Sequence, residues 1–219
     1  MPVDLITLTN PRSPAAEAFR TLRTNLEFSA LDQPLHTLLV TSAAPDEGKS
    51  TTVANLAVVL AQTNKRVILV DADMRHPSLH EYFGVDGRAG LVNYLQGVAD
   101  DPKPLLQETK VGGLWLLPSG PVPPNPADLL ALPRLSELID ILRHQADMVL
   151  FDAPPVVVVT DALIVGAQVD GVLLVINATT TKRSYAQQAK ALLAKVQARL
   201  VGAVLNNVTA DATMQRYYG

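Results

Sequence analysis

Four short runs of mostly apolar residues constrain the fold of this chain more than any other feature. They are residues 37–42, 66–70, 148–151 and 171–176. Apolar runs without polar alternation favour strands that are covered on both faces, as in a parallel sheet. Helix-forming segments lie between the runs, and such crossovers place helices on both faces. The sequence therefore predicts one α/β domain over residues 1–219, with three α/β/α layers and a mainly parallel sheet.

Composition excludes several classes of protein. Hydrophobic residues make up 48% and charged residues 18%, with 18 basic against 21 acidic residues and a net charge of −3. Nucleic-acid binding would need a clear excess of Lys and Arg, so we expect no nucleic-acid partner. Cysteine is absent, which excludes disulfides, zinc–thiolate sites and a cysteine nucleophile and suits a reducing cytoplasm. The apolar stretches are far shorter than the ~20 residues that cross a bilayer, so we expect no direct membrane insertion.

The remaining segments are expected to be helices, two further strands and two polar ends. Residues 1–12 are predicted as a loose arm, and a helix over 13–31 begins with Ser13 as N-cap and Pro14 as first helical residue. Further helices are predicted at 49–64, 77–84, 90–97, 125–145, 161–168 and 182–200, and further strands at 114–117 and 203–205. Residues 209–219 are predicted as a polar tail.

A phosphate-binding loop is the clearest chemical motif. Ala43 to Ser50 matches A-x-x-x-x-G-K-S, between a predicted strand and a predicted helix. Such a loop directs backbone N–H groups and the positive end of the helix dipole at phosphate oxygens. Gly48 lets the backbone approach, Lys49 reaches the β- and γ-phosphates, and Ser50 binds magnesium. The expected nucleotide-binding residues are Asp46, Glu47, Gly48, Lys49, Ser50 and Thr51.

Three aspartates follow buried strands. Asp71 and Asp73 come after one strand and Asp152 after another. Ligands of open α/β sheets bind outside the carboxyl ends of the strands, so these side chains should converge on the phosphate loop. Magnesium prefers oxygen ligands from one or two carboxylates, phosphates and water. The pattern predicts a P-loop NTPase-type fold that binds a nucleotide and Mg²⁺.

These motifs together resemble a known family. The chain is similar, over nearly its whole length, to the bacterial tyrosine kinases of capsular and exopolysaccharide synthesis, in their stand-alone cytoplasmic form. The matching residues are Glu17-x-x-Arg20-x-x-Arg23, the phosphate loop, Asp71-Ala72-Asp73-Met74-Arg75 with Pro77 and His80, Gly120 with Pro123-Pro124-Asn125-Pro126, and Phe151-Asp152-Ala153-Pro154-Pro155. The D-x-D-x-R and D-x-P-P pair on one P-loop chain is the most specific part of the match.

The resemblance implies an ATP-dependent protein-tyrosine autokinase. Lys49 and Ser50 would bind the phosphates and magnesium. Asp71 would lie near the metal, where the family proposes a base for the tyrosine hydroxyl. Asp73 and Asp152 would complete the magnesium shell, largely through water. Phosphoryl transfer needs mostly positioning and charge neutralisation, which these groups can supply.

The resemblance also implies partners. The phosphate acceptors would be Tyr217 and Tyr218, in the tail of a neighbouring subunit. Glu17, Arg20 and Arg23 resemble the family's subunit-contact motif and imply a ring-shaped homo-oligomer. A membrane-bound activator that regulates polysaccharide chain length would recruit the cytoplasmic kinase to the inner face of the plasma membrane. Asn206 resembles the position at which related P-loop ATPases contact adenine.

Two alternative functions stay open, and the phosphate loop differs from the family pattern at one residue. A ParA/MinD-like ATPase would share the fold, but that group has an extra lysine where this chain has Ala44. A nucleotide-gated, non-catalytic scaffold is the third alternative. Asp46 replaces a common family glycine, which predicts a positive φ there, since Asp tolerates that conformation better than most residues. Its charge is expected to weaken nucleotide affinity modestly.

Overall fold

A single sheet organises the molecule. The structure is a computed structural model that describes residues 4–29, 31 and 33–208. Within them seven strands pair in the order β3-β4-β2-β5-β1-β6-β7, all parallel except β3 with β4. The strands are β1 (Thr37–Ser42), β2 (Val67–Asp71), β3 (Gln107–Glu108), β4 (Leu114–Leu117), β5 (Met148–Asp152), β6 (Gly171–Asn177) and β7 (Leu200–Asn206). The predicted mainly parallel sheet is confirmed.

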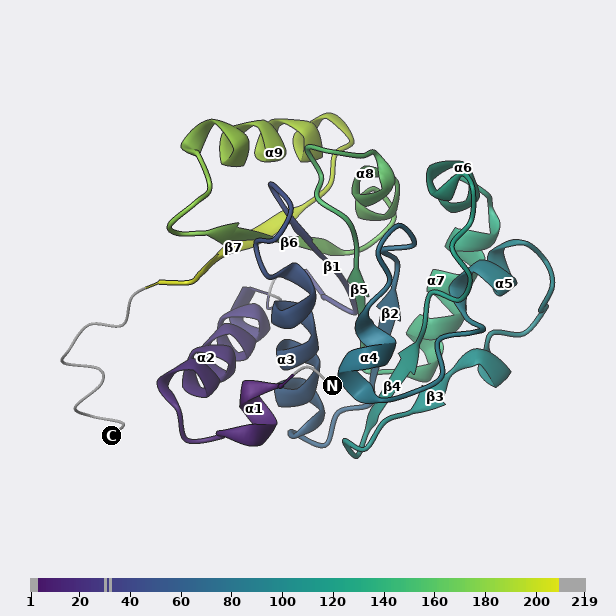
Figure 1. Cartoon of the computed structure of the whole chain (residues 1–219), viewed down its shortest axis with the longest axis horizontal. Helices are drawn as coiled ribbons and strands as arrows, with labels where there is room; N and C mark the ends of the chain where they lie inside the picture. The colour runs from purple at the N-terminus through teal and green to yellow at the C-terminus, as the bar shows by residue number, and fades with distance from the viewer. Residues whose placement is uncertain (1–3, 30, 32, 209–219) are drawn as a thin grey trace.

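Helices cover both faces of this sheet, as Figure 1 shows for α2 and α3 on one side and α8 and α9 on the other. The helices of the first side are α1 (Ile6–Thr9), α2 (Pro14–Ser29), α3 (Lys49–Ala61) and α4 (Leu79–Phe83). Those of the second side are α5 (Leu91–Leu95), α6 (Pro126–Leu130), α7 (Arg134–Gln145), α8 (Asp161–Gly166) and α9 (Arg183–Lys195). A short 3₁₀ turn, η1 (Lys103–Leu105), precedes β3. The three predicted layers are therefore present.

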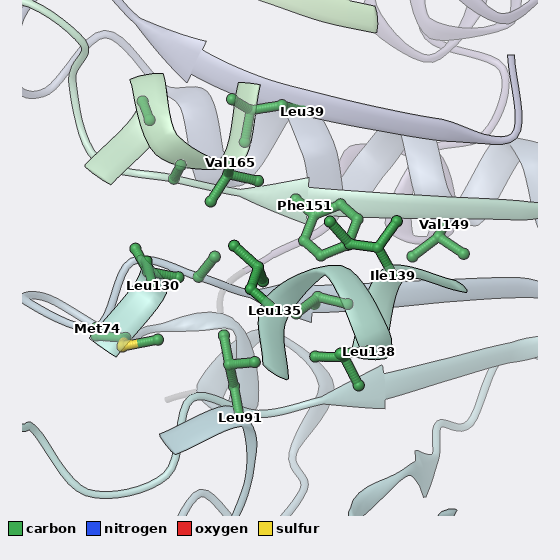
Figure 2. Close-up of a cluster of buried hydrophobic side chains, with 14 of the residues drawn as sticks. Leu39, Met74, Leu91, Leu130, Leu135, Leu138, Ile139, Val149, Phe151 and Val165 are labelled. Atoms are coloured by element: carbon green, nitrogen blue, oxygen red, sulfur yellow. The ribbon is translucent and has the colours of Figure 1, made fainter. Parts of the chain in front are cut away.

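Two hydrophobic clusters, one on each face, hold the layers together. Successive residues of a strand point to opposite faces, so Leu39 joins one cluster while Leu38 and Val40 join the other. Figure 2 shows the first cluster, with Leu138 and Ile139 of α7 among the side chains packed there. Strands that contribute to both clusters must be apolar throughout, which explains the runs that the sequence displays.

The N-terminal arm is more ordered than predicted. Residues 6–9 form α1, and Leu5 and Thr7 are buried. The backbone N–H and the hydroxyl of Thr7 both donate to Oδ1 of Asn55 in α3, at 3.1 and 2.8 Å. The prediction of a loose arm over residues 1–12 is wrong for these residues, because a buried amide on α3 holds the short helix in place.

The predicted helix over 125–145 is broken in two. The structure ends α6 at Leu130 and begins α7 at Arg134. Pro133 lies between them, and proline has no N–H and disfavours a helical conformation in the preceding residue. The proline therefore separates the two helices.

Other boundaries differ more modestly. The final strand spans Leu200–Asn206 rather than 203–205, and α9 ends at Lys195 rather than near residue 200. Gln197, with φ 57°, turns the chain between them. The helix predicted over 13–31 spans Pro14–Ser29, and the Ser13 hydroxyl accepts the Ala16 N–H at 3.2 Å, as expected of an N-cap.

The fold brings the carboxyl ends of β1, β2 and β5 side by side, because β5 pairs with both of the others. The phosphate loop follows β1, and the aspartates follow or end β2 and β5. No helix in residues 4–29, 31 and 33–208 has the length and apolar character needed to cross a bilayer. The predicted tail, with Tyr217 and Tyr218, lies outside the described residues.

Candidate active site

The phosphate loop has the backbone that its motif requires. It joins β1 to α3, and Gly48, at φ 83°, immediately precedes the first helical residue, Lys49. A Cβ on Gly48 would lie 2.2 Å from Nδ2 of Asn206, so any larger residue would collide there. Asp46 has φ 59°, which confirms the positive φ predicted from the missing glycine. The residues at the amino end of α3 line a cavity in which a phosphate can meet their backbone N–H groups.

Glu47 braces the loop instead of facing the phosphates. Its side chain is 2% exposed, and Oε2 accepts the Ala44 N–H at 2.9 Å. Oε1 accepts the hydroxyl of Thr181, from the segment after β6. The Glu47 carbonyl accepts Nδ2 of Asn206 at 3.0 Å. Glu47 and Asn206 thus fix the loop's shape, and the adenine contact of Asn206 stays a prediction.

Lys49 lies among the predicted carboxylates. Its Nζ is 2.7 Å from Oδ2 of Asp73 and 3.6 Å from Oδ1 of Asp152, and it donates to the Ser50 hydroxyl at 3.0 Å. Burial alone would lower the pKa of Lys49, but the charges of Asp152 and Asp73 outweigh it and raise that pKa. Lys49, Asp73 after β2 and Asp152 at the end of β5 therefore form one charged cluster.

Asp71 and Asp152 are completely buried in the floor of this cluster. Oδ2 of Asp71 accepts the backbone N–H groups of Ser78 and Leu79, each at 3.0 Å, at the start of α4. Burial, and then the charge of Asp152, raises the pKa of Asp71 to about 8. Burial raises the pKa of Asp152 to about 6, although Lys49 opposes this. A cation bound nearby would therefore stabilise the ionised form of both carboxyl groups.

The donor set fits magnesium. Within the described residues, Oδ1 of Asp71 and both carboxylate oxygens of Asp152 are buried without a hydrogen-bond partner. Buried oxygens of this kind are costly unless a cation or water meets them. No closed cluster of three or more His, Cys, Asp or Glu ligands exists in the described part of the chain. Ser50, Asp71, Asp73 and Asp152 would therefore share the ion with phosphates and water, as magnesium prefers.

A cavity of about 470 Å³ opens above this floor. Six predicted site residues line it, namely Asp46, Gly48, Lys49, Ser50, Thr51 and Asp73. Four predicted residues do not line the cavity. Asp71, Asp152 and Glu47 are buried, and Asn206 is bonded to the Glu47 carbonyl. The structure thus brings together the residues predicted for the nucleotide and metal sites. Some line the cavity, and others lie behind its surface and contact the loop or the charged cluster.

The cavity is also lined by residues to which the sequence analysis assigned no role. Arg75 and His76 follow Asp73, and Tyr82 of α4 donates or accepts a 2.9 Å hydrogen bond with the Thr51 hydroxyl. The segment after β5 adds Pro154, Pro155, Val158 and Val159. The D-x-D-x-R and D-x-P-P patterns contain Arg75 and the prolines, so the sequence held a signal for them. Tyr82 had none, since its place depends on how α4 packs against α3.

The residues of the predicted subunit contact lie on α2, away from this cavity. Arg20 donates to Oε2 of Glu17 at 2.7 Å and to the Pro11 carbonyl at 2.6 Å. Arg23 donates to the Val59 carbonyl of α3 at 3.0 Å. Each arginine therefore has a partner within its own chain, and the oligomer contact stays a prediction.

Comparison with known proteins places the chain in a family. A model described as the CobQ/CobB/MinD/ParA nucleotide binding domain matches residues 38–218. Tyrosine-protein kinase YwqD of Bacillus subtilis (strain 168) is 42% identical over 217 residues, which cover 99% of this chain and 91% of that protein. The chain belongs to the bacterial tyrosine-protein kinases. In Tyrosine-protein kinase wzc of Salmonella typhimurium, 36% identical, the match spans 30% of the protein.

Solved structures of similar proteins share the fold. The kinase domain of Escherichia coli tyrosine kinase ETK gives a TM-score of 0.92 at 33% identity, covering 97% of this chain and 83% of that one. The chimerical protein CapA2B2 gives 0.89 at 35% identity, covering 94% and 90%. The septum site-determining protein MinD of Pyrococcus horikoshii, complexed with Mg-ADP, gives 0.68 at 22% identity, covering 83% and 76%, which shows the fold alone. The P-loop NTPase-type architecture is therefore confirmed.

Proposed function

We propose that this chain transfers the γ-phosphoryl group of ATP to tyrosine hydroxyls in the tail of neighbouring copies, at Tyr217 and Tyr218. The observation that carries the proposal is the cluster in which Lys49 lies 2.7 Å from Asp73 and 3.6 Å from Asp152 at the amino end of α3. A triphosphate whose β-phosphate meets that helix end would place its terminal phosphate beside these carboxylates.

The reaction forms one bond and breaks another. The phenol oxygen of the acceptor bonds to the γ-phosphorus while the bond from that phosphorus to the β–γ bridging oxygen breaks, and ADP leaves with the electron pair. The phenolic proton goes to a carboxylate of the site, and the family resemblance described above assigns this role to Asp71. Bound magnesium would supply charge neutralisation on the phosphates.

Lys49 and the loop N–H groups hold the phosphates in line. Lys49 would exchange its carboxylate partners for phosphate oxygens when the nucleotide binds, and Asp73 and Asp152 would then be available to hold magnesium. One wall of the cavity is apolar and offers a surface for an aromatic ring next to the phosphates. It is formed by Pro154, Pro155, Val158 and Val159. The cavity thus combines hydrogen-bond donors for phosphate with an apolar wall, which suits a tyrosine as the phosphate acceptor.

We also propose an assembly and a biological role for the chain, both of which rest on the family resemblance. Copies of the chain form a ring through Glu17, Arg20 and Arg23, so that the tail of one copy reaches the cavity of the next. A membrane-bound activator holds the cytoplasmic ring at the inner face of the plasma membrane. Phosphorylation then regulates the synthesis and export of a capsular or extracellular polysaccharide.

Incubation with radiolabelled ATP and magnesium tests the activity. The wild type should incorporate phosphate on tyrosine, and a variant with Tyr217→Phe and Tyr218→Phe should lose most of that label while its binding of Mg-ADP is unchanged. Release of inorganic phosphate without protein labelling would favour the ParA/MinD-like ATPase. Binding of ATP with neither labelling nor phosphate release would favour the non-catalytic scaffold.

A further inference from the structure

Arg75 reaches the nucleotide cavity while a fully buried carboxylate holds it from behind. Its Nε and Nη2 donate to Oδ2 and Oδ1 of Asp161, both at 2.9 Å. Asp161 is 0% exposed, whereas the Arg75 side chain is 35% exposed and lines the cavity. The bidentate pair uses one edge of the guanidinium and leaves other N–H groups available for a ligand.

Stability alone is a weak reason for this pair. Burying a carboxylate costs several kcal/mol, and a buried ion pair often adds no more stability than apolar residues of the same size. What the pair does achieve is geometric. Asp161 follows the apolar wall after β5, and Arg75 follows Asp73 after β2, so the ion pair ties together two sides of the cavity.

The site of the terminal phosphate lies on this same side. A P-loop lysine contacts the β- and γ-phosphates, and here Lys49 extends to Asp73 and toward Asp152. The γ-phosphate would therefore lie near the segment that carries Asp73. Arg75, two residues further along, is the second cation that lines this cavity.

We propose that Arg75 donates hydrogen bonds to the phosphoryl group during transfer, and that Asp161 is the positioning residue that orients it. This inference rests on the proposed function. As the phenol oxygen bonds to the γ-phosphorus and the bond to the bridging oxygen breaks, negative charge is spread over the γ-phosphoryl and bridging oxygens. A fixed guanidinium at that point stabilises the transition state more than the bound nucleotide.

The test uses the full chain with Arg75→Ala, Arg75→Lys and Asp161→Asn, and Arg88→Ala as the matched control. Arg88 pairs with Asp86 on the surface and is 90% exposed, away from the cavity residues. The acceptor is a peptide with the sequence of residues 209–219. The measurements are kcat and KM for the peptide, the Kd of Mg-ADP and the melting temperature.

Arg75→Ala should lower kcat about 100-fold, the typical loss of one transition-state donor, with the Kd of Mg-ADP and the KM changed less than about threefold. Arg75→Lys should recover only part of this loss, since an ammonium cannot keep the bidentate bond. Arg88→Ala should match the wild type.

A double-variant cycle separates positioning from stability. If Asp161 acts through Arg75, Asp161→Asn should lower kcat about tenfold in the wild type and have almost no effect when Arg75→Ala is also present. A purely structural role would instead lower the melting temperature and reduce kcat equally in both backgrounds, which would overturn the role of Asp161. If Asp161→Asn does not fold, the Arg75 variants alone decide the proposal.

Unchanged kcat in a folded, ADP-binding Arg75→Ala variant would overturn the inference while the proposed function stands. A wild type that binds Mg-ATP but never labels the peptide or its own tail would instead overturn the proposed function. The two failures are therefore distinct.

Discussion

At the scale of single residues, Asp46 shows how much a motif can predict. The sequence predicted a positive φ from the family glycine that Asp46 replaces, and the structure gives 59°. It could not predict that Glu47, one residue further on, points back to Ala44 and Thr181, because that choice depends on a segment 134 positions away. Backbone requirements are encoded locally, whereas side-chain partners depend on the whole fold.

Removing the charge of Asp46 should tighten nucleotide binding. Asp46 is exposed and lines the cavity, so its repulsion of phosphate should be small, about two- to fourfold in affinity, as for other exposed charges. Asp46→Gly and Asp46→Asn should both lower the Kd of Mg-ADP in calorimetry, since Asn keeps the tolerance for positive φ and removes only the charge. The gain should shrink at high salt. Weaker or unchanged binding in both variants would reject this role for the charge.

At the scale of elements, the buried strands and the short helices α4 and α5 were predictable, whereas β3 and α1 were not. Residues 67–70 are apolar because both faces of β2 are covered, and that signature survives in the sequence. β3 has only two residues, Gln107 and Glu108, and exists because β4 offers an edge. α1 likewise depends on the buried amide of Asn55. Elements whose stability comes from a distant partner leave little local pattern.

Asp170 connects three elements and makes a prediction about stability. Its Oδ2 accepts the backbone N–H groups of His36 and Thr37 at 2.9 and 2.8 Å and the Thr37 hydroxyl at 2.9 Å, and its Oδ1 pairs with Arg143 of α7. Asp170→Ala should therefore lower the free energy of unfolding by about 2–4 kcal/mol in urea at pH 7. Asp140→Ala, an exposed carboxylate on α7, should change it by less than about 0.5 kcal/mol.

The effect of Asp170 should depend on pH. Burial alone would raise the pKa of Asp170, but hydrogen bonds from Arg143, Thr37 and His36 outweigh it and lower that pKa. A carboxyl group whose pKa is lower in the folded state stabilises the fold above its unfolded pKa of about 3.9, and this is lost as pH falls through the folded-state value. The difference between wild type and Asp170→Ala should thus be constant from pH 6 to 8 and shrink below pH 4. A difference that grows in acid would contradict this assignment.

At the scale of the whole molecule, the sequence predicted the site better than its surroundings. The phosphate loop and the three aspartates could be placed together because parallel strands share one edge for their carboxyl ends. Pro133 is itself a local signal for the break between α6 and α7. The wall formed by Tyr82 needed the packed structure, since it depends on how α4 meets α3. Motifs encode the chemistry, while packing determines which further residues surround it.

The proposed ring makes a prediction about mass. Arg20→Ala combined with Arg23→Ala should convert oligomers to monomers in light scattering, whereas Thr21→Ala, at an exposed position on the same helix, should keep the wild-type mass. Arg23 also bonds the Val59 carbonyl, so a melting temperature must accompany the measurement. A folded double variant with unchanged mass would remove these arginines from the contact.

Transfer between subunits is the central claim, and a mixing experiment tests it most directly. Lys49→Met protein, which keeps both tail tyrosines but loses the lysine of the phosphate loop, is mixed with an active variant that carries Tyr217→Phe and Tyr218→Phe. After incubation with ATP and magnesium, mass spectrometry should find phosphate on Tyr217 or Tyr218 of the Lys49→Met chain in the mixture and none when that chain is incubated alone. Phosphate on the Lys49→Met chain alone, or none in the mixture while wild-type protein labels its own tail, would contradict the account.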